Sequence, residues 1–194
     1  AALERAADAD KAGRARSILD RFLASLAEDA RSGDSGTAKL SREVRNAYNS
    51  VLTACAYTPA DAGRERRNDA ARILVATLRE MNRFSWPADS MGGGVGGPNQ
   101  ESYALFIQGC THLFESNSEE RTELLRAAFH ECCRRGLLNR IIWDKICGSV
   151  KPEFVKMFVG DISDSQDSMT REKNYLNKYE DLPDEWRNNG SPEQ

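Results

Sequence analysis

The most reactive side chains of the sequence gather at His130-Glu-Cys-Cys133, where an imidazole and two thiols stand within four positions. A helix would place His130 and Cys133 on one face, where they could share a metal ion or act as base and nucleophile. A zinc site needs further ligands, and no third ligand follows at helical spacing. The second histidine, His112, falls in a different predicted helix, and neither histidine has a suitably spaced Asp or Ser partner. We therefore expect no metal site, no catalytic residue and no enzymatic activity.

Two further features could contact phosphate groups. The run Gly92–Gly97 is rich in glycine, but it lacks the G-K-[ST] ending of a phosphate-binding loop, and we interpret it as a flexible linker. Arginines cluster at two predicted helix ends, as Arg64, Arg66 and Arg67 and as Arg134, Arg135 and Arg140. These clusters could bind phosphates, or they could form a solvated face balanced by neighbouring acidic residues. The sequence leaves both interpretations open.

The cysteines indicate a reducing compartment rather than a disulfide-bonded scaffold. They are odd in number, their spacing follows no disulfide framework, and no CxxC pair occurs. We interpret them as buried, small apolar residues. The five are Cys55, Cys110, Cys132, Cys133 and Cys147.

The composition sets limits without indicating a function. Of the 194 residues, 40% are hydrophobic and 29% are charged, which is enough apolar surface for a folded core. No run of about 18 apolar residues occurs, so we expect no membrane-spanning helix and no membrane partner. The formal charge is −3, so the chain lacks the excess of Lys and Arg that nucleic-acid-binding chains usually carry. The chain opens on Ala1 rather than Met, so we expect an interior fragment or a processed chain, in which a targeting peptide would not be visible.

Apolar residues recur at helical spacing along most of the chain, and no segment alternates with the period of a strand. The predicted helices are 11–30, a segment capped by Ser41 that runs through Cys55, 65–81, a segment from Pro98–Asn99 through Leu113, a segment opened by the Ser116–Glu119 capping box and closed by Gly136, a segment from Asn139 through Cys147, and a short stripe over 154–159. We therefore predict an all-α chain.

The end of the chain differs in character from the rest. Residues 161–194 hold nine acidic and four basic residues, a net charge of −5, whereas the preceding 160 residues sum to +2. We predict a helical-repeat domain over 1–160 and an acidic, partly irregular tail over 161–194. Leu182 and Trp186 are apolar residues in this polar stretch. We expect them either to fold back over the last hairpin as a cap or, with the rest of Tyr175–Trp186, to bind a partner protein.

Two interleaved sets of residues recur at a shift of 55 positions. Tyr48 and Cys55, seven residues apart, are matched by Tyr103 and Cys110, and in the alternate helices Ile18-Leu19 is matched by Ile73-Leu74. The aromatic and apolar positions return once more at Trp143 and Ile146. Self-similarity of this kind predicts helical hairpins that each bury an apolar face on their neighbours.

The repeated segments resemble the pentatricopeptide-repeat family. Helix A of that family carries a Y-N-x-L-I type signature, which Tyr48-Asn-Ser-Val-Leu52 approximates. Helix B carries an A-x-x-x-L/F-x-x-M ending, which is similar to the stretch from Ala70 to Met81. The resemblance covers about Lys11 to Cys147, as a leading helix B, two complete repeats and a trailing helix A. The repeats here are stretched relative to the family by the Pro59–Gly63 turn and the glycine-rich insertion.

The resemblance implies a right-handed α-α superhelix, which is a solenoid of antiparallel helical hairpins, that binds single-stranded RNA. It also implies a place in organellar RNA processing or expression, in a mitochondrion or plastid, without a small-molecule cofactor. In that family the residue two after the Tyr and the residue three before the next aromatic residue read one base, while the residue before the Tyr wedges beside it. The positions implied here are the pairs Ser50 with Gln100 and Leu105 with Arg140, the wedges Ala47, Ser102 and Ile142, and Lys145, which stands two after Trp143.

Some of these positions depart from what base reading needs. Ser50 and Gln100 could exchange hydrogen bonds with a base edge, but the side chain of Leu105 has no polar atom. Ala47 and Ser102 are small for a stacking wedge. These departures favour a second hypothesis, in which degenerate helical repeats serve as a protein–protein interaction scaffold. The predicted partner is therefore single-stranded RNA or a protein.

The repeat makes Tyr48 a core residue, and this can be measured. Replacing Tyr48 by Ala is expected to lower the free energy of unfolding by roughly 3–5 kcal/mol, the range for removal of a buried aromatic side chain. A loss below about 1 kcal/mol in denaturant melts would place Tyr48 outside the core.

Overall fold

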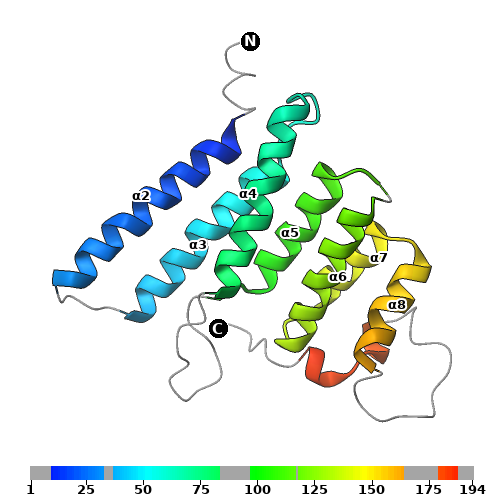
Figure 1. Ribbon diagram of the computed structural model, residues 1–194. Coiled ribbons are helices and arrows are strands. Elements are labelled where there is room, and N and C mark those ends of the chain that lie inside the picture. The colour runs from blue at the N-terminus through cyan, green and yellow to red at the C-terminus, as the bar shows by residue number, and fades with distance from the viewer. Residues whose placement is uncertain (1–9, 33–36, 84–96, 117, 164–178, 188–194) are drawn as a thin grey trace. The chain divides into compact units, whose positions relative to one another are not determined.

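The computed structural model describes residues 10–32, 37–83, 97–116, 118–163 and 179–187 (Figure 1). For residues 29–32, 37–41, 161–163 and 181 it describes the backbone alone. The described residues form helices and turns without a strand, which confirms the predicted all-α class. They divide into two compact units, 1–113 and 114–194, so the predicted domain 1–160 contributes to both units and the acidic tail belongs to the second. Over the described ranges, no helix is both long enough and apolar enough to cross a membrane.

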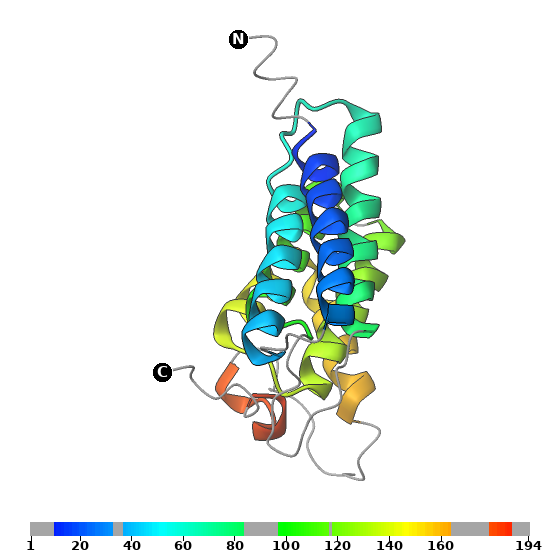
Figure 2. The same cartoon turned by 90° about the vertical axis from the view of Figure 1, so that its left-hand side faces the viewer.

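The described residues of the first unit form four helices in two layers. They are α2 (Lys11–Ser32), α3 (Thr37–Ala56), α4 (Arg64–Arg83) and α5 (Gln100–Leu113). Helix α3 packs against the other three, and α4 packs against both α2 and α5. Figures 1 and 2 show that α2 and α4 begin at one end of the unit, whereas α3 and α5 run in the opposite direction. Consecutive helices are thus antiparallel, and helices two apart in the chain lie side by side.

The core of this unit consists of the residues that recur in the sequence. Tyr48 and Tyr103 are both fully buried, as are the cysteines seven residues after them. These positions confirm the predicted inward face of α3 and α5. Further fully buried residues are Leu19, Leu52, Leu74, Met81 and Ile107. One prediction is wrong: Ile18 was expected on the apolar stripe of α2, but it is 58% exposed, and only its neighbour Leu19 enters the core.

Glycine and capping residues set most of the helix ends. Gly63, with a φ of 80°, closes the predicted turn before α4, and Gly136, with a φ of 65°, follows the end of α6 (Glu119–Arg134). Two predicted caps are wrong. Helix α3 begins at Thr37, four residues before Ser41, so Ser41 lies inside the helix and does not cap it. Helix α6 is capped by Ser118 rather than Ser116, since the Ser118 hydroxyl oxygen accepts the Arg121 backbone N–H at 3.2 Å.

The second unit has an aromatic core. Its helices are α6, α7 (Arg140–Ser149) and α8 (Pro152–Ser163), followed by the short 3-10 helices η1 (Tyr179–Asp181) and η2 (Asp184–Trp186). Asn139 caps α7 as predicted, by accepting the Ile142 backbone N–H at 2.9 Å. The ring of Phe129 lies at the centre of the core. Its centroid is 6.1 Å from that of Trp143 and 6.2 Å from those of Phe158 and Trp186.

Residues 179–187 of the acidic tail contribute to this core. Leu182 and Trp186 are 2% and 6% exposed. The carbonyl of Trp186 accepts the Leu138 backbone N–H at 2.9 Å, and the Tyr179 hydroxyl donates to the Leu138 carbonyl at 3.1 Å. Of the two expectations for this segment, the structure therefore confirms that Leu182 and Trp186 fold back over the last hairpin.

Helices α4 and α5 approach each other closely at Gly109. A methyl group built on Gly109 would lie 2.7 and 2.8 Å from the two terminal carbons of Leu74, which is fully buried. Hydrogen is thus the only side chain that fits this crossing without displacing its neighbour.

We expect Gly109→Ala to destabilise the first unit. The clash costs about 1–3 kcal/mol and exceeds the roughly 1 kcal/mol that alanine contributes to a helix, so the unfolding free energy should fall. Gly148→Ala in α7 is the matched control, since its added methyl group meets nothing within 4 Å and should be neutral or slightly stabilising. Thermal and urea melts followed by circular dichroism measure both variants. Equal stabilisation by the two substitutions would contradict close packing at Gly109.

Candidate functional site

In the first implied pair of base-reading residues, Ser50 and Gln100 each adjoin a residue of one hydrogen-bonded link between α3 and α5, which is centred on Asn49. The Asn49 amide nitrogen donates to the Glu101 carboxylate at 3.1 Å and lies 3.4 Å from the Asn99 side-chain oxygen. Because Asn99 and Glu101 flank Gln100, these contacts hold the start of α5 against the middle of α3, next to Ser50. The side chain of Ser50 is exposed and that of Gln100 is half-buried. The Ser50 hydroxyl donates to the Asn46 carbonyl at 2.9 Å, which leaves its oxygen able to accept.

Ser102 does not fit the implied role of wedge, because it is fully buried inside this link. Its hydroxyl donates to the Asn49 side-chain oxygen at 2.6 Å and accepts the Asn99 backbone N–H at 3.2 Å. In return, the Asn99 side-chain oxygen accepts the Ser102 backbone N–H at 3.0 Å. This reciprocal cap starts α5 at Gln100 and joins it to α3 in one buried network. The sequence places the start of this helix at Pro98–Asn99, which the structure confirms, but it gives no sign of Asn49 as the residue that positions the helix.

The other implied positions lack the arrangement of the first pair. Leu105 and Ala47 are half-buried, Lys145 is half-buried on α7, and Ile142 is fully buried, so Ile142 cannot wedge beside a base. Arg140 is exposed, but its guanidinium contacts two carboxylates, at 3.1 Å to Asp144 and 2.8 Å to Glu180. The pair with Asp144 has the i, i+4 spacing of a helical ion pair, but the sequence pattern could not indicate the pair with Glu180, which lies 40 positions away.

The exposed face of α3 carries Arg42 and Glu43 near the start of the helix and uncharged residues after them. The exposed residues Asn46, Ser50, Thr53 and Tyr57 follow one another at helical spacing over about 16 Å. We call these four residues the α3 stripe. The hydroxyl of Thr53, like that of Ser50, donates to a carbonyl one turn earlier, at 2.8 Å from the Asn49 oxygen. The stripe therefore presents amide and hydroxyl groups in a chain in which 29% of the residues are charged.

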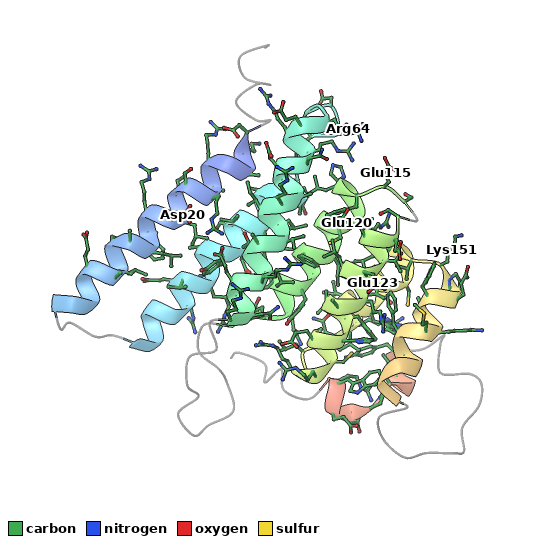
Figure 3. The ribbon with its side chains drawn as sticks, in the orientation of Figure 1. Asp20, Arg64, Glu115, Glu120, Glu123 and Lys151 are labelled. Atoms are coloured by element: carbon green, nitrogen blue, oxygen red, sulfur yellow. The ribbon has the colours of Figure 1, made fainter. Side chains whose placement is uncertain are left out.

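The two arginine clusters differ in their surroundings. Arg64 and Arg66 are exposed in the first turns of α4, where Figure 3 labels Arg64. Arg67 donates to the His112 carbonyl at 2.8 Å. In the second cluster, Arg134 and Arg135 both bind the carboxylate of Glu131 at 2.6 Å. Hydrogen bonds from Arg134 and then Arg135 lower the pKa of this carboxyl group. The charges of the second cluster are thus balanced by neighbouring carboxylates, as the interpretation of a solvated face predicts.

The cysteines and histidines form no reactive site within the described segments. Burial raises the pKa of Cys55 and Cys132 to about 12, so these thiols stay protonated near neutral pH. His130 contacts the Phe158 carbonyl at 3.1 Å and His112 contacts the Thr58 carbonyl at 2.8 Å. Among the described residues, no group of three His, Cys, Asp or Glu side chains could hold a metal ion. Residues 92–96 of the predicted linker lie outside the described residues.

Comparisons with known proteins found no matching family model, no matching curated protein and no matching solved structure. The resemblance to pentatricopeptide repeats therefore depends on the sequence motifs alone.

The buried network predicts different costs for two serines. Ser102→Ala should lower the free energy of unfolding by about 1–3 kcal/mol, because the buried Asn49 side-chain oxygen and the Asn99 backbone N–H lose their bonds to the Ser102 hydroxyl. Ser50→Ala is the matched control, as its hydroxyl is exposed and bonds only its own helix, so the change should stay within about 0.5 kcal/mol. Urea melts of the two variants test this. Equal, small effects would exclude the network as the link between α3 and α5.

Proposed function

We propose that this chain binds single-stranded RNA along the exposed side of α3 and the start of α5, as a solenoid of the pentatricopeptide-repeat type. The observation that supports the proposal is the link from Asn49, the residue before Ser50, to the residues on both sides of Gln100. A hydroxyl and an amide together offer donors and acceptors to the edge of one base.

The lack of charge on the α3 stripe supports the same function. Base edges are distinguished by hydrogen bonds, whereas phosphates are bound by Lys and Arg without regard to sequence. A surface of amide and hydroxyl groups suits the first task. The packing of α3 beside α5 and of α2 beside α4 is the arrangement expected of stacked hairpins, and we propose a right-handed superhelix by resemblance. A role in organellar RNA processing or expression, and the absence of enzymatic activity, are part of this proposal.

A protein-interaction scaffold is the second candidate. It is favoured by the half-buried Leu105 at a reading position, by the buried Ser102 and Ile142 at wedge positions, and by the ion pairs of Arg140. In that case the exposed side of α3 and α5 would contact a polypeptide, and RNA would bind weakly and without preference.

Selection from a randomised single-stranded RNA pool, at low and high salt, tests the proposal. We expect enrichment of sequences with a preferred base at one position. Ser50→Ala and Gln100→Ala should each weaken binding of the enriched RNA roughly two- to tenfold and reduce that preference, since each removes one hydrogen bond.

Ser25→Ala is the matched control for Ser50→Ala. Ser25 is also exposed and also donates to a carbonyl of its own helix, at 2.8 Å from the Phe22 oxygen, but it lies on α2. Its replacement should leave RNA binding unchanged. Absence of enrichment, or a preference unaffected by Ser50→Ala and Gln100→Ala, would overturn RNA reading by this pair. Flat and salt-insensitive binding would support the scaffold instead.

A further inference from the structure

The α3 stripe ends in an exposed aromatic ring. Tyr57 is 61% exposed, and it is the one aromatic residue among the large, exposed apolar side chains of the described chain. It lies one residue beyond the end of α3, but its backbone N–H still donates to the Thr53 carbonyl at 3.0 Å. The helical backbone therefore continues to Tyr57 and keeps it on the same face as Ser50, seven residues earlier.

Three elements meet next to this ring. The carbonyl of Thr58, the residue after Tyr57, lies 2.8 Å from the His112 ring nitrogen of α5, and the carbonyl of His112 accepts the Arg67 guanidinium of α4 at 2.8 Å. These contacts fix the backbone that follows Tyr57 against α5 and link α5 to α4. The turn that follows is uncrowded at Gly63, where an added methyl group would meet nothing within 4 Å.

The charge around Tyr57 suits a ligand with a negatively charged backbone. The first turns of α4 carry Arg64, Arg66 and Arg67 against the two carboxylates of Asp61 and Glu65. Arg64 and Arg66 are exposed. Figure 3 shows Arg64 at the end of the first unit where α4 begins, which is also where α5 ends at His112. Tyr57 and these two arginines are separated by one turn of the chain, from residue 58 to residue 63. An exposed aromatic ring and exposed guanidinium groups are the side chains that bind unpaired nucleotides, the ring by stacking and the arginines by phosphate contact.

We propose that Tyr57 is a stacking site for an unpaired base of single-stranded RNA, with Arg64 and Arg66 contacting the adjacent phosphates. The site extends RNA bound along the α3 stripe by one base, and this inference rests on the proposed function. Stacking is tolerant of sequence because every base has a π-face, so Tyr57 contributes affinity whereas Ser50 and Gln100 contribute base preference.

The test uses the full chain and the RNA enriched by the unaltered protein. Tyr57→Leu keeps an apolar side chain but removes the ring, whereas Tyr57→Phe keeps the ring and removes the hydroxyl. We expect Tyr57→Leu to weaken binding by about 5- to 150-fold and Tyr57→Phe to stay within about twofold. The preferred base at the Ser50–Gln100 position should not change in either variant. Melting curves of both variants should match the unaltered protein, since the ring is exposed.

A series of RNAs with one abasic position each locates the stacked base. The RNA that lacks the stacked base should bind the unaltered protein more weakly than the complete RNA does. The same RNA should bind Tyr57→Leu as well as the complete RNA does, because that variant has already lost the stacking contact. Equal binding by Tyr57→Leu and the unaltered protein would overturn the stacking site and leave the Ser50–Gln100 proposal standing. Equal losses for Tyr57→Phe and Tyr57→Leu would assign the contact to the hydroxyl and overturn stacking. Failure of the unaltered protein to bind any RNA would overturn both proposals.

Discussion

A single buried amide determines the register of α5 on α3. Asn49 is 5% exposed, so its carboxamide must find hydrogen-bond partners inside the protein. Its partners are at hand only when α5 starts at Gln100 with Asn99 as its cap and Ser102 on the inner side. Sliding α5 by one turn would bury these groups unpaired at a cost of a few kcal/mol. The position of Gln100 along α3 follows directly from this constraint.

Apolar packing holds the same helices together but specifies their position less sharply. Tyr48 and Tyr103 contribute most of the buried aromatic surface of the first unit, and hydrophobic burial has no preferred direction. The distance between α5 and α4 is set at Gly109, where the lack of a side chain lets α5 approach Leu74. Burial thus stabilises the unit, Gly109 sets the spacing between α4 and α5, and Asn49 sets the register of α5 on α3.

The sequence predicts the helices and most of the core because both depend on local periodicity and capping. Tyr48, Tyr103 and the Asn139 cap are of this kind. It does not predict which side of α2 lacks a neighbour, and Ile18 is therefore exposed against expectation. It also misplaces Ser102, whose partner Asn49 lies 53 positions away, and Arg140, whose partner Glu180 lies 40 positions away. Contacts over such separations arise from the fold and leave no signal in local spacing.

The positions that depart from base reading are those whose side chains the fold already uses. Ser102 links two helices, Ile142 fills the core of the second unit, and Arg140 is paired with carboxylates. The α3 stripe has no such duties, since Ser50 and Thr53 bond only carbonyls of their own helix. Its hydroxyl and amide groups, together with the exposed ring of Tyr57, add nothing to the core. Because the fold does not use these groups, they stay accessible to solvent and to the ligand proposed above.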